Sequence, residues 1–378
     1  MQRECDNVTI KTDPPLLRFF AIPKWILEWS LILLLLAGIP YLIVLAITPV
    51  DKHFTGILIN HLDTNSYFAN MQIGVRGEWL YTLPYSFQKN HPVPLFMFYI
   101  LLGHLARAAH ISIPLAYHLS RLLGGFILVI LSYHYVSRFT QDEREQKLAL
   151  FILLFTGGLG WLVIVLFGAR VEAYLIPDIW ILEGITFGSI LGFPHFILSM
   201  IFMLILLMVG QDCIKYKNWV SGFWAIFAGM GIAFFHPQQL LVVAVVLFVT
   251  VCVEYKNNVQ KLQYDLGLLS LILFPGVILA FLISRQAFRD PLLSSWLKQG
   301  NTYSPPLWSF FYYVWAYVLS GNIGHQTCYP IQIEIRLSGR SMVSISFGVA
   351  LHACQFSATL YRRLAYTDFH ACNTKLVS

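Results

Sequence analysis

Long apolar runs constrain what this chain can fold into more than any other feature of its sequence. Residues 30–47 and 266–284 approach the roughly 20 apolar residues that a helix needs to cross a bilayer. The runs are apolar on every side, whereas a membrane β-barrel needs strands that alternate apolar and polar residues. With 57% hydrophobic and 12% charged residues, the chain also lies outside the range of soluble domains. We therefore expect an all-α, polytopic transmembrane helical bundle.

Seven further apolar segments extend the pattern. Pro237 cannot comfortably continue the helix before it, so two short spans joined by a turn at His236 and Pro237 fit better than one very long helix. The segments divide the chain into an N-terminal segment (1–24), a membrane module (25–320) and a C-terminal segment (321–378). The seven are residues 93–110, 115–136, 148–167, 190–209, 220–235, 237–253 and 307–320.

Positive charge predicts the side of the membrane that each loop faces, because Lys and Arg are enriched in cytoplasmic loops. The N-terminal segment has a modest positive excess and is expected in the cytoplasm, with 30–47 as a retained anchor rather than a signal peptide. The basic segment 138–147 also prefers the cytoplasm. If every apolar segment crosses, however, segment 138–147 lies on the same outer side as residues 51–91. The sequence leaves this conflict open.

Charge and cysteine content exclude other classes of protein. The net charge of +6 lies in loops, and no basic stripe with interleaved aromatic residues indicates a nucleic-acid partner. The six cysteines contain no CxxC pair, so neither a zinc site nor a disulfide framework is indicated. Membrane lipids are the partners that the composition itself predicts.

Two polar loops stand out between the apolar segments. The first loop, residues 51–91, is longer than a connection between neighbouring helices requires. Asp63 and Thr64 there are typical of a helix start, and the rings that follow favour the membrane surface, so we expect a short interfacial helix. The second polar loop, residues 168–189, carries Asp178 and Glu183 and precedes His195.

In this order, these features resemble the GT-C glycosyltransferases, a superfamily of membrane enzymes that includes oligosaccharyltransferases and protein mannosyltransferases. The residues that carry the resemblance are 63–67, the Gly-x-Arg-Gly-Glu-Trp of 74–79, Pro84-Tyr85, and His91-Pro92 before an apolar segment. The likeness continues through His-Leu-Ser-Arg at 118–121 and Phe-Pro-His-Phe at 193–196. It covers the general layout of about residues 30–285.

The resemblance implies transfer of a sugar from a polyprenyl-phosphate carrier to a lipid, glycan or protein acceptor, at the outer face of a plasma membrane. It implies that Asp63 is the essential acid, with Glu78 second, and that Tyr67, Arg76, Arg121 and His195 contact substrate. Asp63, Asp178 and Glu183 would hold a divalent cation, Mg²⁺ or Mn²⁺, the ions that carboxylate ligands suit.

Each assignment has a simpler alternative. Asp63 would serve equally as a helix cap, and Glu78 beside Arg76 as a weak surface pair. The charges of the second loop would simply be solvated. Arg121 lies near the start of a span, where it needs a partner such as a donor phosphate or reaches the lipid headgroups.

Two further functions stay open beside glycosyl transfer. A multi-pass transporter would use the same spans, although no internal repeat indicates one, and a non-catalytic envelope assembly protein would need no reactive acid. After Ser320 the apolar aromatic pattern stops, and the rest departs from the family layout. A truncated or frame-altered product is one hypothesis for that change.

Overall fold

The computed structural model describes residues 22–155, 157, 165–166, 176, 180–255, 258–299, 335–337 and 341–343. Within this part of the chain, five helices are long and apolar enough to cross a membrane. They coincide with the apolar segments predicted at 30–47, 115–136, 190–209, 237–253 and 266–284. The five are α1 (Lys24–Ile47), α4 (Ile113–Val136), α9 (Pro194–Tyr216), α11 (Gln238–Tyr255) and α12 (Val259–Arg289).

Helix α10 (Trp219–Phe235) covers the span predicted at 220–235 and is slightly shorter, at 17 residues or about 25 Å. It starts beside Lys217, which pairs with Asp265 near the start of α12. At its other end the ring of Phe235 lies 6.3 Å from that of Phe98. The helix therefore runs the length of the bundle between α9 and α12.

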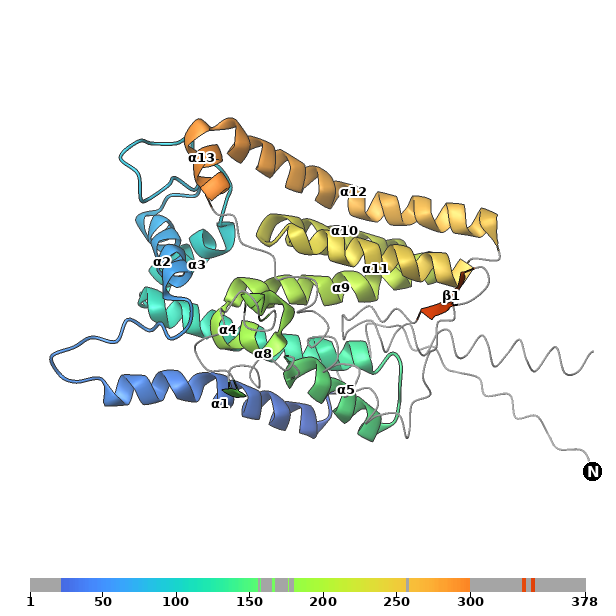
Figure 1. Cartoon of the computed structure of the whole chain (residues 1–378), viewed down its shortest axis with the longest axis horizontal. Coiled ribbons are helices and arrows are strands. Elements are labelled where there is room, and N and C mark those ends of the chain that lie inside the picture. The colour runs from blue at the N-terminus through green and yellow to red at the C-terminus, as the bar shows by residue number, and fades with distance from the viewer. Residues whose placement is uncertain are drawn as a thin grey trace, which may run out of the picture.

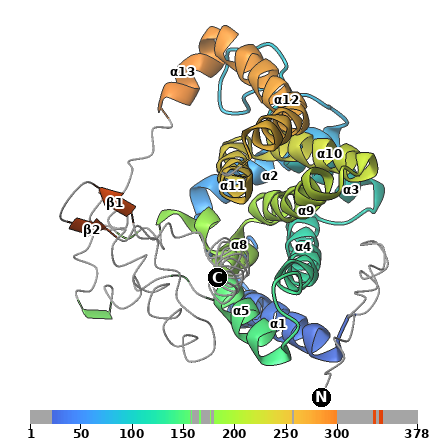
Figure 2. The ribbon, with the colours of Figure 1, turned by 90° about the vertical axis from the view of Figure 1, so that its right-hand side faces the viewer.

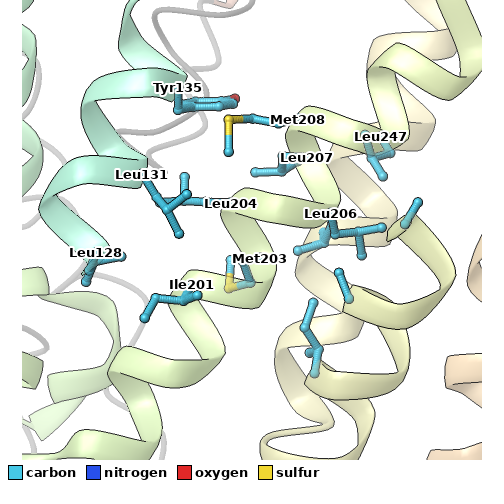
Figure 3. Close-up of a cluster of buried hydrophobic side chains, with 14 of the residues drawn as sticks. Leu128, Leu131, Tyr135, Ile201, Met203, Leu204, Leu206, Leu207, Met208 and Leu247 are labelled. Atoms are coloured by element: carbon cyan, nitrogen blue, oxygen red, sulfur yellow. The ribbon is translucent and has the colours of Figure 1, made fainter. Parts of the chain in front are cut away.

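The helices form a stack that is visible along the bundle axis in Figure 2. The order runs from α1 through α4 and α9 to α10, α11 and α12 (Figure 1). Side chains of α4 and α9 make the centre of the core, where Leu128, Leu131, Leu204 and Leu207 interdigitate (Figure 3). Large apolar side chains also fill the outer faces: Leu42 of α1 is 64% exposed, as expected where lipid is the solvent.

Two helices lie between α1 and α4: α2 (His61–Arg76), within the first loop, and α3 (Met97–Ala108), which follows it. They lie at one end of the bundle, with α13 (Pro291–Gln299) above them in Figure 1. A 3-10 turn, η4 (Leu182–Gly184), and α8 (Thr186–Gly192) lead into α9. We call the end of the bundle where α2, α3 and α13 lie the α2–α3 end.

The prediction that residues 93–110 cross the membrane is wrong. Helix α3 has 12 residues, which span about 18 Å, against about 30 Å of hydrocarbon. It packs against α2, and the two backbones touch where Gly74 meets Gly103: a Cβ on either glycine would lie 2.0 Å from a carbonyl oxygen of the other helix. The apolar content of α3 serves this helix pair and not a crossing.

This correction removes the charge conflict in the sequence. Without a crossing at α3, the basic segment 138–147 lies at the end where α1 begins: the Nζ of Lys147 is 5.4 Å above the ring of Trp25. Arg138 forms an ion pair with Asp212 near the end of α9, at 2.7 Å. Lys217 lies at that end too, so the basic segment 138–147 and Lys217 share the end of the bundle that lies away from α2 and α3.

Other predicted segments are described only in part. Helix α5 (Glu143–Phe155) begins the span predicted at 148–167, most of whose remaining residues lie outside the described residues. The span predicted at 307–320 lies outside them as well. In the C-terminal segment, β1 (Ile335–Leu337) pairs antiparallel with β2 (Ser341–Val343), with Arg336 opposite Met342.

The short α3 yields a topological prediction. A Cys at position 52 (Lys52→Cys) and one at 141 (Gln141→Cys) should lie on opposite sides of the membrane, because one crossing fewer separates them. Both positions are exposed. In chains whose accessible native cysteines are replaced by serine, an impermeant maleimide applied to sealed membranes should label one of the two. If both cysteines are labelled from the same side, residues 93–110 cross the membrane after all.

The Gly74–Gly103 contact yields a second prediction. Gly74→Ala should lower the free energy of unfolding by about 1–3 kcal/mol, because the added Cβ overlaps the carbonyl of Ile100 and the two backbones must separate. Thermal unfolding in detergent measures the change. Gly267→Ala in α12 is the matched control, since a Cβ there meets nothing within 4 Å. Equal unfolding temperatures for Gly74→Ala and the control would show that the contact is not tight.

Candidate functional site

Asp63 stands in the first turn of α2 and is exposed. The cap of this helix is Asn60, in the left-handed conformation at φ 45°, whose side-chain oxygen accepts from the backbone N–H of Asp63 at 3.4 Å. The Asn60 amide in turn donates to one oxygen of the Asp63 carboxylate at 2.5 Å. The capping role considered for Asp63 therefore belongs to Asn60, and within the described residues one oxygen of the Asp63 carboxylate is bonded to that cap.

One turn further on, Tyr67 joins a group of aromatic side chains from three elements. Its ring stacks on Tyr99 of α3, with centroids 4.3 Å apart, and meets the edge of His195 at 5.0 Å. The hydroxyl of Tyr99 lies 2.5 Å from Nδ1 of His195. Tyr117 of α4 stacks behind Tyr99 at 6.3 Å. We call Tyr67, Tyr99, Tyr117 and His195 the aromatic junction.

The pKa of Tyr67 responds to carboxylates of both polar loops. The pKa of Tyr67 is raised because the side chain is buried and because the carboxylates of Asp63 and Glu183 both oppose loss of its proton. Glu183, in η4, is half-buried and stands close enough to act on the same phenol. The carboxylates of Asp63 and Glu183 therefore both lie near Tyr67, and the end of α8 lies beside the start of α2, because a Cβ on Gly192 would be 3.9 Å from the side chain of Ile59.

His195 is the member of the junction that α9 contributes, and it is half-buried. It is the second residue of α9, after Pro194 at the first position, where a missing N–H costs nothing. Its ring lies 6.1 Å from that of His236, at the end of α10. His236 Nδ1 is buried and bonds to no other residue in the described part of the chain. The rings of Tyr67 and Tyr99 both contact His195.

Arg121 is buried, with 1% of its surface exposed, and faces a break in the backbone. Helix α8 ends at Gly192 and α9 begins at Pro194, which leaves carbonyls without intrahelical partners. Nη1 of Arg121 donates to the carbonyls of Ile190 at 2.8 Å and Leu191 at 3.0 Å, and also to Ala37 of α1 at 3.0 Å. Its partners here are three carbonyls of two helices, α1 and α8.

Two tyrosines complete this arrangement. The hydroxyl of Tyr41 donates to Leu191 at 2.7 Å, and that of Tyr117 donates to Gly192 at 2.5 Å. The Arg121 guanidinium also lies 4.5 Å from the ring centre of Tyr41. A carbonyl in hydrocarbon has no water to bond, so each of these donors removes a cost of several kcal/mol per group.

Arg76 and Glu78 lie apart from Asp63, at the far end of α2. Gly77 closes the helix in the left-handed region at φ 95°, which glycine adopts at no steric cost. The Glu78 carbonyl lies 3.0 Å from Nε2 of His104, and Trp79 stacks on that imidazole at 3.9 Å. Both Arg76 and Glu78 are exposed, and neither belongs to an ion pair within the described residues.

Two of the three predicted metal ligands can be placed. Asp63 and Glu183 both lie near enough to Tyr67 to raise its pKa, and they offer oxygen ligands of the kind that Mg²⁺ and Mn²⁺ prefer. Asp178, the third, lies outside the described residues, as do Arg170 and Glu172 of the same loop. The described residues alone contain no cluster of three or more acidic, His or Cys side chains suited to a metal.

The sequence did not single out Tyr99, Tyr117 or Tyr41. Tyr99 lies in an apolar run that was assigned to a span, and Tyr117 and Tyr41 lie inside true spans. The available signal was a polar hydroxyl within each run, which needs a partner once it is buried.

No protein-family model, curated protein or solved structure matches the chain.

The position of Arg121 generates a prediction that separates its two readings. Arg121→Gln should lower the free energy of unfolding by about 2 kcal/mol or more, because buried carbonyls of α1 and α8 lose their donor. Thermal unfolding in detergent measures this, and Arg107→Gln, at an exposed arginine of α3, is the control. If Arg121→Gln unfolds like the control and loses only substrate affinity, Arg121 is a ligand for substrate instead.

Proposed function

We propose that this chain is a membrane glycosyltransferase that acts at the α2–α3 end. It would transfer one sugar, with inversion, from a polyprenyl-phosphate carrier to a lipid, glycan or protein acceptor. The observation that supports the proposal is that the carboxylates of Asp63 and Glu183, from two separate polar loops, both act on the buried phenol of Tyr67.

The distribution of charge supports a sidedness for this reaction. The turns with Arg138, Lys147 and Lys217 gather at the end where α1 begins, and basic turns favour the cytoplasm. The α2–α3 end then faces away from the cytoplasm, in a plasma membrane, with the N terminus inside. Helices α2 and α3 would lie at the outer surface of the bilayer, where exposed Trp79 and Tyr85 favour the interface.

Asp63 has the properties that a general base needs at such a surface. Its carboxylate is exposed, and only one of its oxygens is occupied, by the Asn60 amide. The acceptor hydroxyl oxygen would form the new bond to the anomeric carbon while the bond from that carbon to the phosphate oxygen breaks. The hydroxyl proton would pass to Asp63, and the polyprenyl phosphate would leave with the bonding electron pair.

Tyr67 and the second acid would organise the surroundings of that base. Tyr67 keeps its phenolic proton because its pKa is raised, so it can donate a hydrogen bond to a sugar or phosphate oxygen. Glu183 and Asp63 would hold a divalent cation, if one is used, and such an ion would supply charge stabilisation for the leaving phosphate. His195, held by Tyr99, would set the position of Tyr67 from below.

The proposal predicts a large loss of activity for Asp63→Asn. Transfer of labelled sugar from a panel of polyprenyl-phosphate donors, measured in membranes, should fall about 100-fold or more, the typical contribution of a general base. Asp51→Asn is the matched control, since Asp51 is an exposed acid of the same loop outside the junction. Both variants should fold and express like the original chain.

Two outcomes would contradict the proposal. Full transfer by Asp63→Asn would exclude Asp63 as the base. No transfer from any donor by the well-folded original chain would favour a multi-pass transporter or a non-catalytic envelope assembly protein.

A further inference from the structure

A second polar feature lies apart from the aromatic junction, at the end of α12. An open cleft of about 490 Å³ separates the first loop from the last turn of this helix. Its apolar lining comes from Leu80 and residues 92–94. Its polar lining comes from Gln286 and Arg289 of α12 and from His91 and Asp290.

The carboxylate of Asp290, the acidic group of this cleft, accepts hydrogen bonds from the backbone. One oxygen of Asp290 accepts from the backbone N–H of His91 at 2.8 Å, and the other accepts from Leu292 at 2.9 Å and Leu293 at 3.1 Å. These bonds, that of His91 foremost, hold the pKa of Asp290 below its usual value. Asp290 thus fixes the first loop to the start of α13, and three backbone N–H groups bond to its carboxylate.

The arginines near the cleft, in contrast, have no acidic partner within the described residues. Arg289 lines the cleft, and Arg285 lies one turn earlier on the same face of α12. Both side chains are exposed, and neither belongs to an ion pair within the described residues. Two like charges at this spacing repel one another slightly, a cost that a bound anion would remove.

The surface that leads to these arginines is apolar. Below Arg285, at helical spacing, α12 presents Leu282, Ile278, Phe274 and Leu271, which are 40–61% exposed. Helix α12 is one of the five helices able to cross a membrane, so this stripe faces lipid. It reaches the arginines at the α2–α3 end, where α12 passes into α13 (Figure 1).

We propose that this cleft binds an acidic phospholipid from the surrounding membrane. The lipid phosphate would bond to Arg289 and Arg285, with Gln286 and His91 as further polar contacts. One acyl chain would lie along the apolar stripe of α12. Charge complementarity selects the head group, because the guanidinium fork pairs well with phosphate oxygens. The bound lipid would join the first loop to α12 from outside, where Asp290 joins them from within.

This proposal does not rest on glycosyl transfer, because it concerns a membrane lipid and a cleft that contains neither Asp63 nor Glu183. Lipid binding is measured on the purified chain without sugar donor or acceptor, so its failure and a failure of the proposed reaction are separate results.

The experiment titrates phosphatidylglycerol into the full chain in detergent and counts bound lipid by native mass spectrometry. The original chain should retain phosphatidylglycerol at lower concentration than the zwitterionic phosphatidylcholine. Arg289→Gln should weaken retention of phosphatidylglycerol about tenfold, the value of one charge-assisted contact. Arg107→Gln, which removes an exposed arginine at the same end but outside the cleft, should bind like the original chain.

Three results would overturn the proposal. Equal retention of the two lipids would exclude selection by charge, and undiminished binding by Arg289→Gln would place the lipid elsewhere. Protection from thermal unfolding by inorganic phosphate at the same concentration as phosphatidylglycerol would indicate a site for a soluble anion and not for a lipid.

Discussion

A backbone carbonyl inside a bilayer has no water to accept from, so an interrupted helix at that depth depends on donors from neighbouring side chains. The break between α8 and α9 is such a place. Arg121 supplies donors to Ile190 and Leu191, and the hydroxyls of Tyr41 and Tyr117 supply the others. These bonds link α1, α4 and α8 through one buried guanidinium, and they fix where α9 begins.

The start of α9 determines what lies above it. Pro194 opens the helix, and His195 follows directly under the rings of Tyr67 and Tyr99. Helix α2 can rest on this surface because Gly74 and Gly103 let α2 and α3 approach to backbone contact. Asp63 is exposed in the first turn of α2, and Glu183 lies at the same end of the bundle, since both act on Tyr67. The candidate site thus depends on the satisfied helix break below it.

Much of this arrangement could be predicted from the sequence. Hydropathy located five spans, because burial in lipid demands about 20 apolar residues whatever the packing. A helix start near Asp63 was also predictable, since Asn, Asp and Thr favour helix N-termini. The failure at 93–110 has a physical reason: an apolar helix that packs on another loop helix has the composition of a short span, and only its length of 12 residues separates them.

The partners of Arg121 could not be predicted, because they are carbonyls, and every residue has one. The sequence showed a cation that needed a partner but not which segment would lack donors. Similarly, the sequence placed Glu183 in a polar loop without fixing its side of the membrane. That side depends on whether α3 crosses, a question of tertiary packing and not of composition.

The central claim is that the loops with Asp63 and Glu183 meet at one end of the bundle. Chemical cross-linking of paired cysteines in membranes tests it most directly, with accessible native cysteines replaced by serine. The pair Asp63→Cys with Glu183→Cys should react with a short bifunctional maleimide. The pair Gln141→Cys with Glu183→Cys should not, because position 141 lies at the opposite end. Absence of the first cross-link, or formation of the second, would contradict the account.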